Sequence, residues 1–361
     1  MKSYAILPRL EVKNLSRSFG NLTVVDKVSF QISSGQVTCL LGPSGCGKST
    51  TLRIIAGVET PSSGQIFVEE KLIGNTTFQV PPEARSIGLM FQDFALFPHL
   101  NVQQNVYFGL SGPKDFKQKR SFDLLKKVGL AHLAFNYPHS LSGGEQQRVA
   151  LIRALAPQPK IMLMDEPFSG LDDRLRDEIR DETFNLLRSE DTAVLMVTHD
   201  PQEAMKVADE IALMRDGKIL QKGAPYNIYN APIDLKALQF FSDANAIQAS
   251  LNGSLADTPF GQFFAPGLSD GTDIDIVFRP QHVRIDFDRN GRGPLPTASQ
   301  GVAARGIVKR ARFVGNESII EFNMDFGQII KASVPNVFLP NTGHPLWLTV
   351  PRDKCYIFPR T

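Results

Sequence analysis

The sequence contains the stretch Gly42-Pro43-Ser44-Gly45-Cys46-Gly47-Lys48-Ser49-Thr50. It matches the phosphate-loop pattern G-x-x-x-x-G-K-[ST], follows the apolar run Val37–Leu41 and precedes a predicted helix at Ser49–Ala56. Glycines in such a loop let backbone N–H groups turn toward phosphate oxygens, and the helix N-terminus adds partial positive charge. Because strand, loop and helix occur in the required order, we interpret the stretch as a phosphate site rather than as a glycine-rich turn.

Two side chains of this loop have expected roles beside a nucleotide. We expect Lys48 to reach the β- and γ-phosphates and the Ser49 hydroxyl to bind Mg²⁺. Cys46 lies in the same loop and has two interpretations. A helix N-terminus can lower the pKa of a thiol and make it a redox sensor, but we favour a small residue without a chemical role.

A pair of acids forms a second motif. The apolar run Ile161–Met164 is followed directly by Asp165 and Glu166. Beside Mg-ATP, Asp165 suits a magnesium site, usually through water, and Glu166 suits a general base for the attacking water. An apolar strand that ends in Asp-Glu is a weak signal alone and becomes specific beside a phosphate loop.

Apolar runs and helical patterns alternate through the first two thirds of the chain. Val37–Leu41, Ile161–Met164 and Ala193–Val197 are almost continuously apolar, as in strands of a parallel sheet covered on both faces. Helical patterns lie between them, at Gln118–Val128 and Leu175–Arg188. This alternation predicts an α/β fold. Shorter strands are expected at Leu10–Val12, Ser29–Ile32 and Ile66–Val68.

The character of the chain changes after about Phe241. Turn-rich segments separate short strand candidates, which predicts a small β-barrel or sandwich. The candidate strands are Ile274–Phe278, Gly306–Phe313, Ser318–Phe322, Ile329–Val334 and Leu346–Val350.

Composition excludes several classes of protein. The 361 residues are 42% apolar and 21% charged with a formal net charge of +2, so neither nucleic acid nor an anionic membrane is required as the main partner. No apolar run reaches the roughly 20 residues of a transmembrane helix, and Met1–Glu11 lacks the apolar core of a signal peptide. Three cysteines without a CxxC pair disfavour disulfides and zinc. We therefore expect a cytosolic protein.

The segment Leu141–Arg148, LSGGEQQR, resembles the signature motif of ABC ATPases. By itself it could be a glycine hinge capped by Ser142. With Gly143 and Gly144, however, Ser142 offers hydroxyl and N–H donors at a helix start, which suits a phosphate. The resemblance implies that two such domains sandwich two ATP molecules, with each phosphate loop facing the signature of the other subunit.

Four further positions match the same family residue by residue. The resemblance implies that Gln92, at the end of a strand at Gly88–Gln92, senses Mg²⁺ and nucleotide, and that His199 contacts the γ-phosphate. Asp172 falls in a D-loop segment in which Gly170 replaces a frequent alanine. Phe19 falls where an aromatic ring stacks on adenine, although a simple core role is the alternative. The expected catalytic residues are thus Lys48, Glu166 and His199, and the expected metal site is Ser49, Gln92 and Asp165.

Two regions resemble bacterial importer subunits in particular. Asp93–Leu100 looks like a segment that docks a short permease helix, with ordinary packing of the helical subdomain as the alternative. Phe278–Val283 and Ala311–Asn316 resemble the accessory OB-like domain of such subunits. The expected fold is therefore an α/β P-loop ATPase domain (residues 1–240) with a helical subdomain (about 93–157), followed by a small all-β OB-like accessory domain (241–361).

An OB-like barrel can also bind nucleic acid. The dense basic cluster of Lys309, Arg310 and Arg312 is balanced by acids, so we interpret it as a solvated face and expect no nucleic-acid binding. Soluble ABC proteins of DNA repair or translation usually carry tandem ATPase domains or long coiled coils, and neither pattern occurs here. Intact Lys48 and Glu166 disfavour a regulator that does not hydrolyse ATP.

The resemblance implies a homodimer on the cytoplasmic face of the cell membrane. Its expected partners are transmembrane permease subunits and, through them, a periplasmic solute-binding protein. The segments Leu238–Asn245 and Cys355–Pro359 look most like ferric-iron importer ATPases. Polyamine, sulfate, molybdate and sugar importers are the alternatives, because the transported solute leaves no direct imprint on this subunit.

Overall fold

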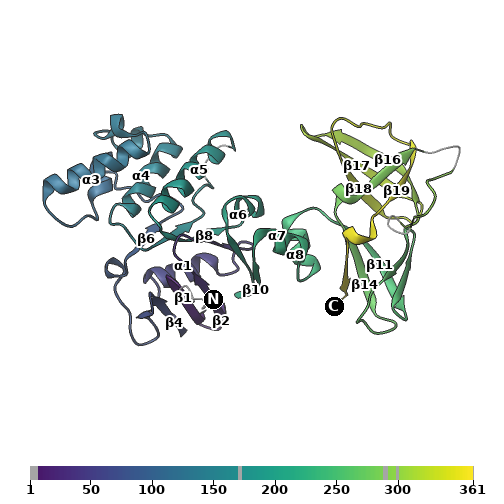
Figure 1. Ribbon diagram of the computed structural model, residues 1–361, viewed down its shortest axis with the longest axis horizontal. Helices are drawn as coiled ribbons and strands as arrows, with labels where there is room; N and C mark the ends of the chain where they lie inside the picture. Colours follow the sequence, from purple (N-terminus) through teal and green to yellow (C-terminus); the bar gives the residue numbers. More distant parts are fainter. Residues whose placement is uncertain (1–6, 170–172, 288–291, 298–300, 361) are drawn as a thin grey trace, which may run out of the picture. The chain divides into compact units, whose positions relative to one another are not determined.

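A computed structural model describes residues 7–169, 173–287, 292–297 and 301–360. The chain forms two compact units, Met1–Ala231 and Pro232–Thr361 (Figure 1). The helix α8 (Leu235–Phe241), at whose end the sequence predicted the domain boundary, belongs to the second unit. Among the described residues, no helix is long and apolar enough to cross a membrane.

The centre of the first unit is a six-stranded sheet with the order β10-β9-β3-β8-β7-β6. The five strands from β9 to β6 pair in parallel, and β10 is antiparallel to β9. Every residue of the central strands β3, β7 and β8 is buried, as their continuous apolar sequences predicted. The strands are β3 (Val37–Leu41), β6 (Ile87–Met90), β7 (Ile161–Asp165), β8 (Ala193–Thr198), β9 (Glu210–Arg215) and β10 (Lys218–Gly223).

Parallel pairing determines where the functional segments lie. The phosphate loop follows β3, the Asp-Glu pair ends β7, and His199 follows β8. Since parallel strands point the same way, these segments meet at one edge of the sheet, where α/β proteins usually bind their ligands. The prediction that β6 ends at Gln92 was wrong by two residues, because its pairing with β7 stops at Met90↔Met164.

A second sheet of this unit is antiparallel, with the order β2-β1-β4-β5. Its strands are β1 (Leu10–Phe19), β2 (Leu22–Ile32), β4 (Ser63–Val68) and β5 (Lys71–Gly74). The sequence predicted only Leu10–Val12 of β1. Register shifts between Val12, Leu15 and Arg17 interrupt the alternation of apolar and polar residues, which hides the rest of the strand from a period-two pattern.

The helices α2, α3 and α4 share an apolar core of their own, which includes Val106, Leu125 and Ile152. The α3 helix begins at Lys114, four residues before the predicted Gln118 and directly after Pro113. The sequence missed this start because Phe116 is the one apolar side chain of the first turn and does not by itself form an apolar stripe. The helices of the first unit are α1 (Lys48–Ala56), α2 (Val102–Tyr107), α3 (Lys114–Lys127), α4 (Gly143–Leu155), α5 (Asp173–Ser189), α6 (Pro201–Val207) and α7 (Pro225–Asn230).

The second unit contains two five-stranded antiparallel sheets, ordered β13-β12-β11-β14-β20 and β15-β19-β16-β17-β18. Side chains from both sheets form one apolar core, which includes Phe260, Phe278 and Phe322. The prediction of a small all-β domain with OB-like character is confirmed. The strands are β11 (Asn245–Asn252), β12 (Leu255–Thr258), β13 (Gly261–Phe264), β14 (Asp273–Phe278), β15 (Arg284–Phe287), β16 (Ala304–Phe313), β17 (Glu317–Met324), β18 (Ile329–Pro335), β19 (Pro345–Thr349) and β20 (Cys355–Pro359).

Candidate active site

The phosphate loop leaves β3 and enters α1 through glycines that no larger residue could replace. A Cβ atom on Gly42 would lie 2.1 Å from the Met214 carbonyl oxygen. Gly47, the N-cap of α1, has a φ of 102°, and a Cβ there would lie 2.3 Å from the Val24 carbonyl oxygen. The loop is therefore pressed against neighbouring backbone, and its shape depends on glycine.

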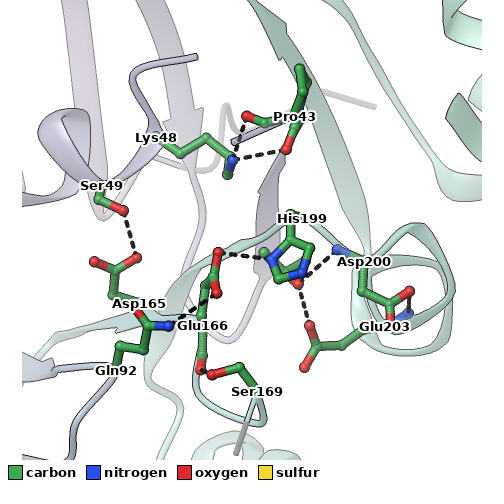
Figure 2. Close-up of polar contacts among 12 residues, drawn as sticks. Pro43, Lys48, Ser49, Gln92, Asp165, Glu166, Ser169, His199, Asp200 and Glu203 are labelled. Carbon is green, nitrogen blue, oxygen red and sulfur yellow. Dashed lines mark hydrogen bonds and ion pairs between the residues drawn. The ribbon is translucent and has the colours of Figure 1, made fainter. Parts of the chain in front are cut away.

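Lys48 is the first residue of α1, and its side chain is buried under the loop. Its Nζ donates to the carbonyl oxygens of Gly42 at 2.8 Å and Pro43 at 2.9 Å (Figure 2). The loop, Ser49, Thr50 and Glu166 line one cavity of about 230 Å³. A buried ammonium group thus lies in the wall of a cavity that also holds a carboxylate.

Cys46 is buried in the same loop. Burial raises the pKa of its thiol, and the nearby Lys48 ammonium offsets only part of that rise. This shift is opposite to the one that a redox-sensing thiol needs.

Ser49 and Asp165 bring two oxygen ligands together. The Ser49 hydroxyl donates to Asp165 Oδ1 at 2.9 Å, from the start of α1 to the end of β7. Burial, together with the Glu166 carboxylate, raises the pKa of Asp165, and the Ser49 hydrogen bond opposes that rise. A hydroxyl and a carboxylate are hard oxygen donors, the kind that Mg²⁺ prefers.

Glu166 connects three of the predicted functional segments. Its Oε1 lies 2.8 Å from His199 Nδ1, and its Oε2 accepts from Gln92 Nε2 at 3.4 Å (Figure 2). The backbone of Glu166 has a φ of 46° and donates its N–H to the Val197 carbonyl oxygen at 2.9 Å. This left-handed conformation is uncommon for a residue other than glycine and directs the carboxylate toward both partners.

Ser142, Gly143 and Gly144 lie at the start of α4, apart from the hydrogen bonds that Lys48, Glu166 and His199 make with Gly42, Pro43 and Gln92 and with one another. Ser142 is the N-cap of α4. Its N–H and hydroxyl both donate to Glu145 Oε2 at 2.8 Å, and the Glu145 N–H donates to Ser142 Oγ at 3.4 Å. Ser142 and Gly143 are exposed, so the start of α4 faces a surface outside this group, and Glu145 accepts the Ser142 donors there.

Phe19, at the end of β1, is 47% exposed. This exposure excludes the alternative that the ring is part of the core. The Arg17 guanidinium lies 4.5 Å from the centroid of the ring, a cation–π contact that the sequence analysis did not predict. Gly170 and Asp172 of the predicted D-loop lie outside the described residues.

The segment after Gln92 is held by two residues that the sequence did not single out. Arg153 of α4 donates from Nη1 to the Ala95 carbonyl oxygen at 2.6 Å and from Nη2 to that of Phe94 at 2.8 Å. The buried Asn105 of α2 donates to the carbonyl oxygens of Phe97 and Leu100 at 3.1 and 3.0 Å. An Arg in the last turn of one helix and an Asn within another carry no distinctive sequence signal, so only the structure reveals these contacts.

Comparison with known proteins identifies both units. Residues 25–169 match the family model described as ABC transporter, and residues 276–358 match that of the TOBE domain. The putrescine transport ATP-binding protein PotG of Escherichia coli K12 is 38% identical over 95% of this chain and 92% of its own length. The chain belongs to the ABC transporter family.

Other ABC relatives agree with this assignment. The Fe(3+) ions import ATP-binding protein FbpC of Mesorhizobium japonicum is 41% identical over 97% of this chain and 99% of its own length. A solved ATP-binding cassette of an ABC transporter in its ADP conformation is 25% identical with a TM-score of 0.57, covering 65% of this chain and 98% of that one. The dimeric post-hydrolysis state of another cassette, bound to ADP and phosphate, is 30% identical with a TM-score of 0.53, covering 60% and 98%.

The resemblance read from the signature motif is therefore confirmed. This ABC protein is an ATP-binding subunit and an ATPase of the transport class. In the second unit, the basic cluster that raised the question of nucleic acid is partly neutralised, because Arg312 Nη2 lies 3.2 Å from Glu321 Oε1.

Proposed function

We propose that this ABC protein binds Mg-ATP between two copies of the chain and uses its hydrolysis to power import through a membrane permease. The observation that carries the proposal is the single cavity that brings the buried Lys48 beside Ser49 and Glu166. A cation for phosphate, a hydroxyl for a metal and a base for water are the three groups that ATP hydrolysis requires.

ATP is held first by the loop and its lysine. The backbone N–H groups of residues 42–50 bind phosphate oxygens, and Lys48 exchanges its bonds with Gly42 and Pro43 for the β- and γ-phosphates. Phe19 stacks on adenine, which its exposure supports. Ser49 and Asp165, with Gln92 as the third predicted ligand, would hold Mg²⁺, and the bound metal would offset the negative charge of the phosphates.

Hydrolysis then depends on the group around Glu166. Its carboxylate accepts a proton from the attacking water, and Gln92 and His199 keep the carboxylate in place before the nucleotide arrives. His199 is half exposed, so it can turn from Glu166 to the γ-phosphate without leaving a buried site. Each of these steps uses a residue that already borders the cavity or touches Glu166.

The dimer completes each site. Ser142, Gly143 and Gly144 offer the exposed N-terminal donors of α4 to the γ-phosphate bound by the other copy. The dimeric cassette with ADP and phosphate supports this arrangement. Hydrolysis breaks the covalent link between the two sets of contacts, which allows the copies to separate.

The permease binds beside Gln92. The segment Asp93–Leu100 is fixed by Arg153 and Asn105, which gives a rigid surface for a short permease helix. This contact holds the chain on the cytoplasmic face of the cell membrane, and the permease connects it to a periplasmic solute-binding protein.

The transported solute is ferric iron. Several relatives named as Fe(3+) import ATP-binding proteins share 40–43% identity with this chain, which supports iron, and the PotG and PotA relatives at 38% and 37% keep polyamine as the alternative. We expect that deletion of this chain, in a strain without other iron systems, abolishes ⁵⁵Fe uptake from ferric salts and leaves putrescine uptake intact. Normal ⁵⁵Fe uptake with lost putrescine uptake would exclude iron and leave the ATPase proposal standing.

A further inference from the structure

We propose that Glu203 is a positioning residue for ATP hydrolysis, which fixes the backbone of His199 through the hydroxyl of Thr198. The inference rests on the proposed role of His199 at the γ-phosphate. It assigns a function to a buried carboxylate that takes no part in binding ATP, Mg²⁺ or the attacking water.

The contacts form a clamp around His199. The Thr198 hydroxyl donates to Glu203 Oε2, and its own oxygen, Thr198 Oγ1, accepts the Asp200 N–H at 3.1 Å. Asp200, which follows His199, is therefore bonded to the side chain of Thr198, which precedes His199, and Glu203 holds that side chain in place. Thr198 is 2% exposed and Glu203 is 8% exposed, so water competes little for these bonds (Figure 2 shows Glu203 and Asp200 beside His199).

Both ends of the clamp are anchored in regular structure. Thr198 is the last residue of β8 and pairs with Leu41 of β3, the residue before the phosphate loop. Asp200 is the N-cap of α6, where its Oδ1 accepts the N–H groups of Gln202 at 2.8 Å and Glu203 at 3.3 Å. The position of His199 is thus defined by a sheet on one side and a helix on the other.

A buried carboxylate at this position requires an explanation. Burial raises the pKa of Glu203, which reflects the cost of keeping a charge away from water. An apolar residue would fill the same space without that cost, but it could not accept the Thr198 hydroxyl. Glu203 also lines a cavity of about 120 Å³ together with Glu166 and His199, so it belongs to the same pocket wall as the catalytic pair.

His199 needs this support because its own side chain has little. It is 52% exposed, and within the described part of the chain its imidazole hydrogen-bonds with Glu166. The direction of the imidazole is therefore set mainly by the backbone that carries it. A displacement of about 1 Å at a reacting group can cost about 10²-fold in rate.

The test is a double-mutant cycle on the full chain, with steady-state ATPase and ADP affinity as readouts. We expect Glu203→Ala to lower kcat by about 10- to 100-fold and Glu203→Gln to retain most of it, because an amide oxygen also accepts the Thr198 hydroxyl. In a His199→Ala background, Glu203→Ala should lower kcat less than about twofold further, since it acts through the missing histidine. ADP affinity should not change, because ADP has no γ-phosphate.

Three results would overturn the inference. They are wild-type kcat in Glu203→Ala, equal loss in Glu203→Gln, or additive loss with His199→Ala. Gln202→Ala, an exposed neighbour on α6, is the matched control and should behave as wild type. If Glu203→Ala does not fold, Thr198→Val and Thr198→Ser test the same clamp, with loss expected only for valine. Absent ATPase activity in the wild-type chain would instead refute the proposed function.

Discussion

Glu145→Gln should make ATP-driven closure of the dimer easier. The Glu145 carboxylate accepts the N–H and hydroxyl of Ser142, and these bonds hold its pKa below the usual range, so it is charged at neutral pH. A γ-phosphate bound by Ser142 would therefore meet an anion that already occupies the same donors. Glutamine completes the same capping box without the charge, so α4 should keep its first turn.

The size of the effect follows from two hydrogen bonds that share one oxygen. Glu145 Oε2 lies 2.8 Å from Ser142 Oγ, and a phosphate oxygen on the other side would lie at a similar distance, so the two anions would be at most roughly 5.5 Å apart. Two unit charges at that separation repel by about 0.8 kcal/mol in water and about 3 kcal/mol at an effective dielectric constant of 20. Removal of the charge should lower the half-saturating ATP concentration by roughly 4- to 150-fold.

The assay is an ATP titration of an inter-subunit distance, read by fluorescence or spin labels in a Glu166→Gln background that slows turnover. Glu83→Gln makes the same change of charge at an exposed position in another part of the chain and serves as the control. The difference between Glu145→Gln and its parent should shrink in high salt, because salt screens exposed charges. An unchanged or higher half-saturating ATP concentration would show that Glu145 does not lie beside the phosphate.

Three other changes test the parts of the site separately. Lys48→Ala removes a buried cation and should weaken ATP binding by about 2 to 5 kcal/mol in titration calorimetry while the chain stays folded, and near-normal affinity would refute the phosphate-loop assignment. Phe19→Ala should weaken the binding of a fluorescent ATP analogue by about 1 to 3 kcal/mol, and Phe19→Trp should leave that binding unchanged. Equal binding by the wild type and both variants would show that the Phe19 ring contacts Arg17 and not adenine. Arg153→Ala removes the hydrogen bonds to the carbonyl groups of Phe94 and Ala95 and should reduce the amount of this chain that co-purifies with the permease. Undiminished co-purification would show that the segment after Gln92 does not dock the permease.

The fold was predictable where the sequence pattern is uniform. Continuous apolar runs identified β3, β7 and β8, because strands buried on both faces need no alternation. The pattern failed along β1, where register shifts break the period, and at the first turn of α3, where Phe116 is the one apolar side chain. The spacing of apolar residues thus shows which part of an element faces the core, but it does not show where the element begins and ends.

The candidate site also contains residues that the sequence could predict and contacts that it could not. Lys48, Asp165 and Glu166 were predictable because phosphate chemistry demands these groups in one order along the chain. The contacts of Glu203 with Thr198 and of Arg153 with residues 94 and 95 were not, because they join common residue types across different elements. Only the three-dimensional structure gives such contacts a meaning, since neither the spacing nor the residue type distinguishes them from a solvated surface.

The most direct test of ATP hydrolysis between two copies is a distance measured in Glu166→Gln. One probe is attached next to Ser142 in one copy and the other in the phosphate loop of the second copy. A distance is a better readout than the size of the complex, because contacts between the second units could keep the two copies associated after the ATP sites open. Loss of a general base is worth about 10²- to 10⁴-fold, so turnover should fall by that much while ATP shortens the distance and ADP does not. Ser142→Arg in the same background should block the shortening. An unchanged distance with ATP, or normal hydrolysis by Glu166→Gln, would contradict the sandwich with Glu166 as its base.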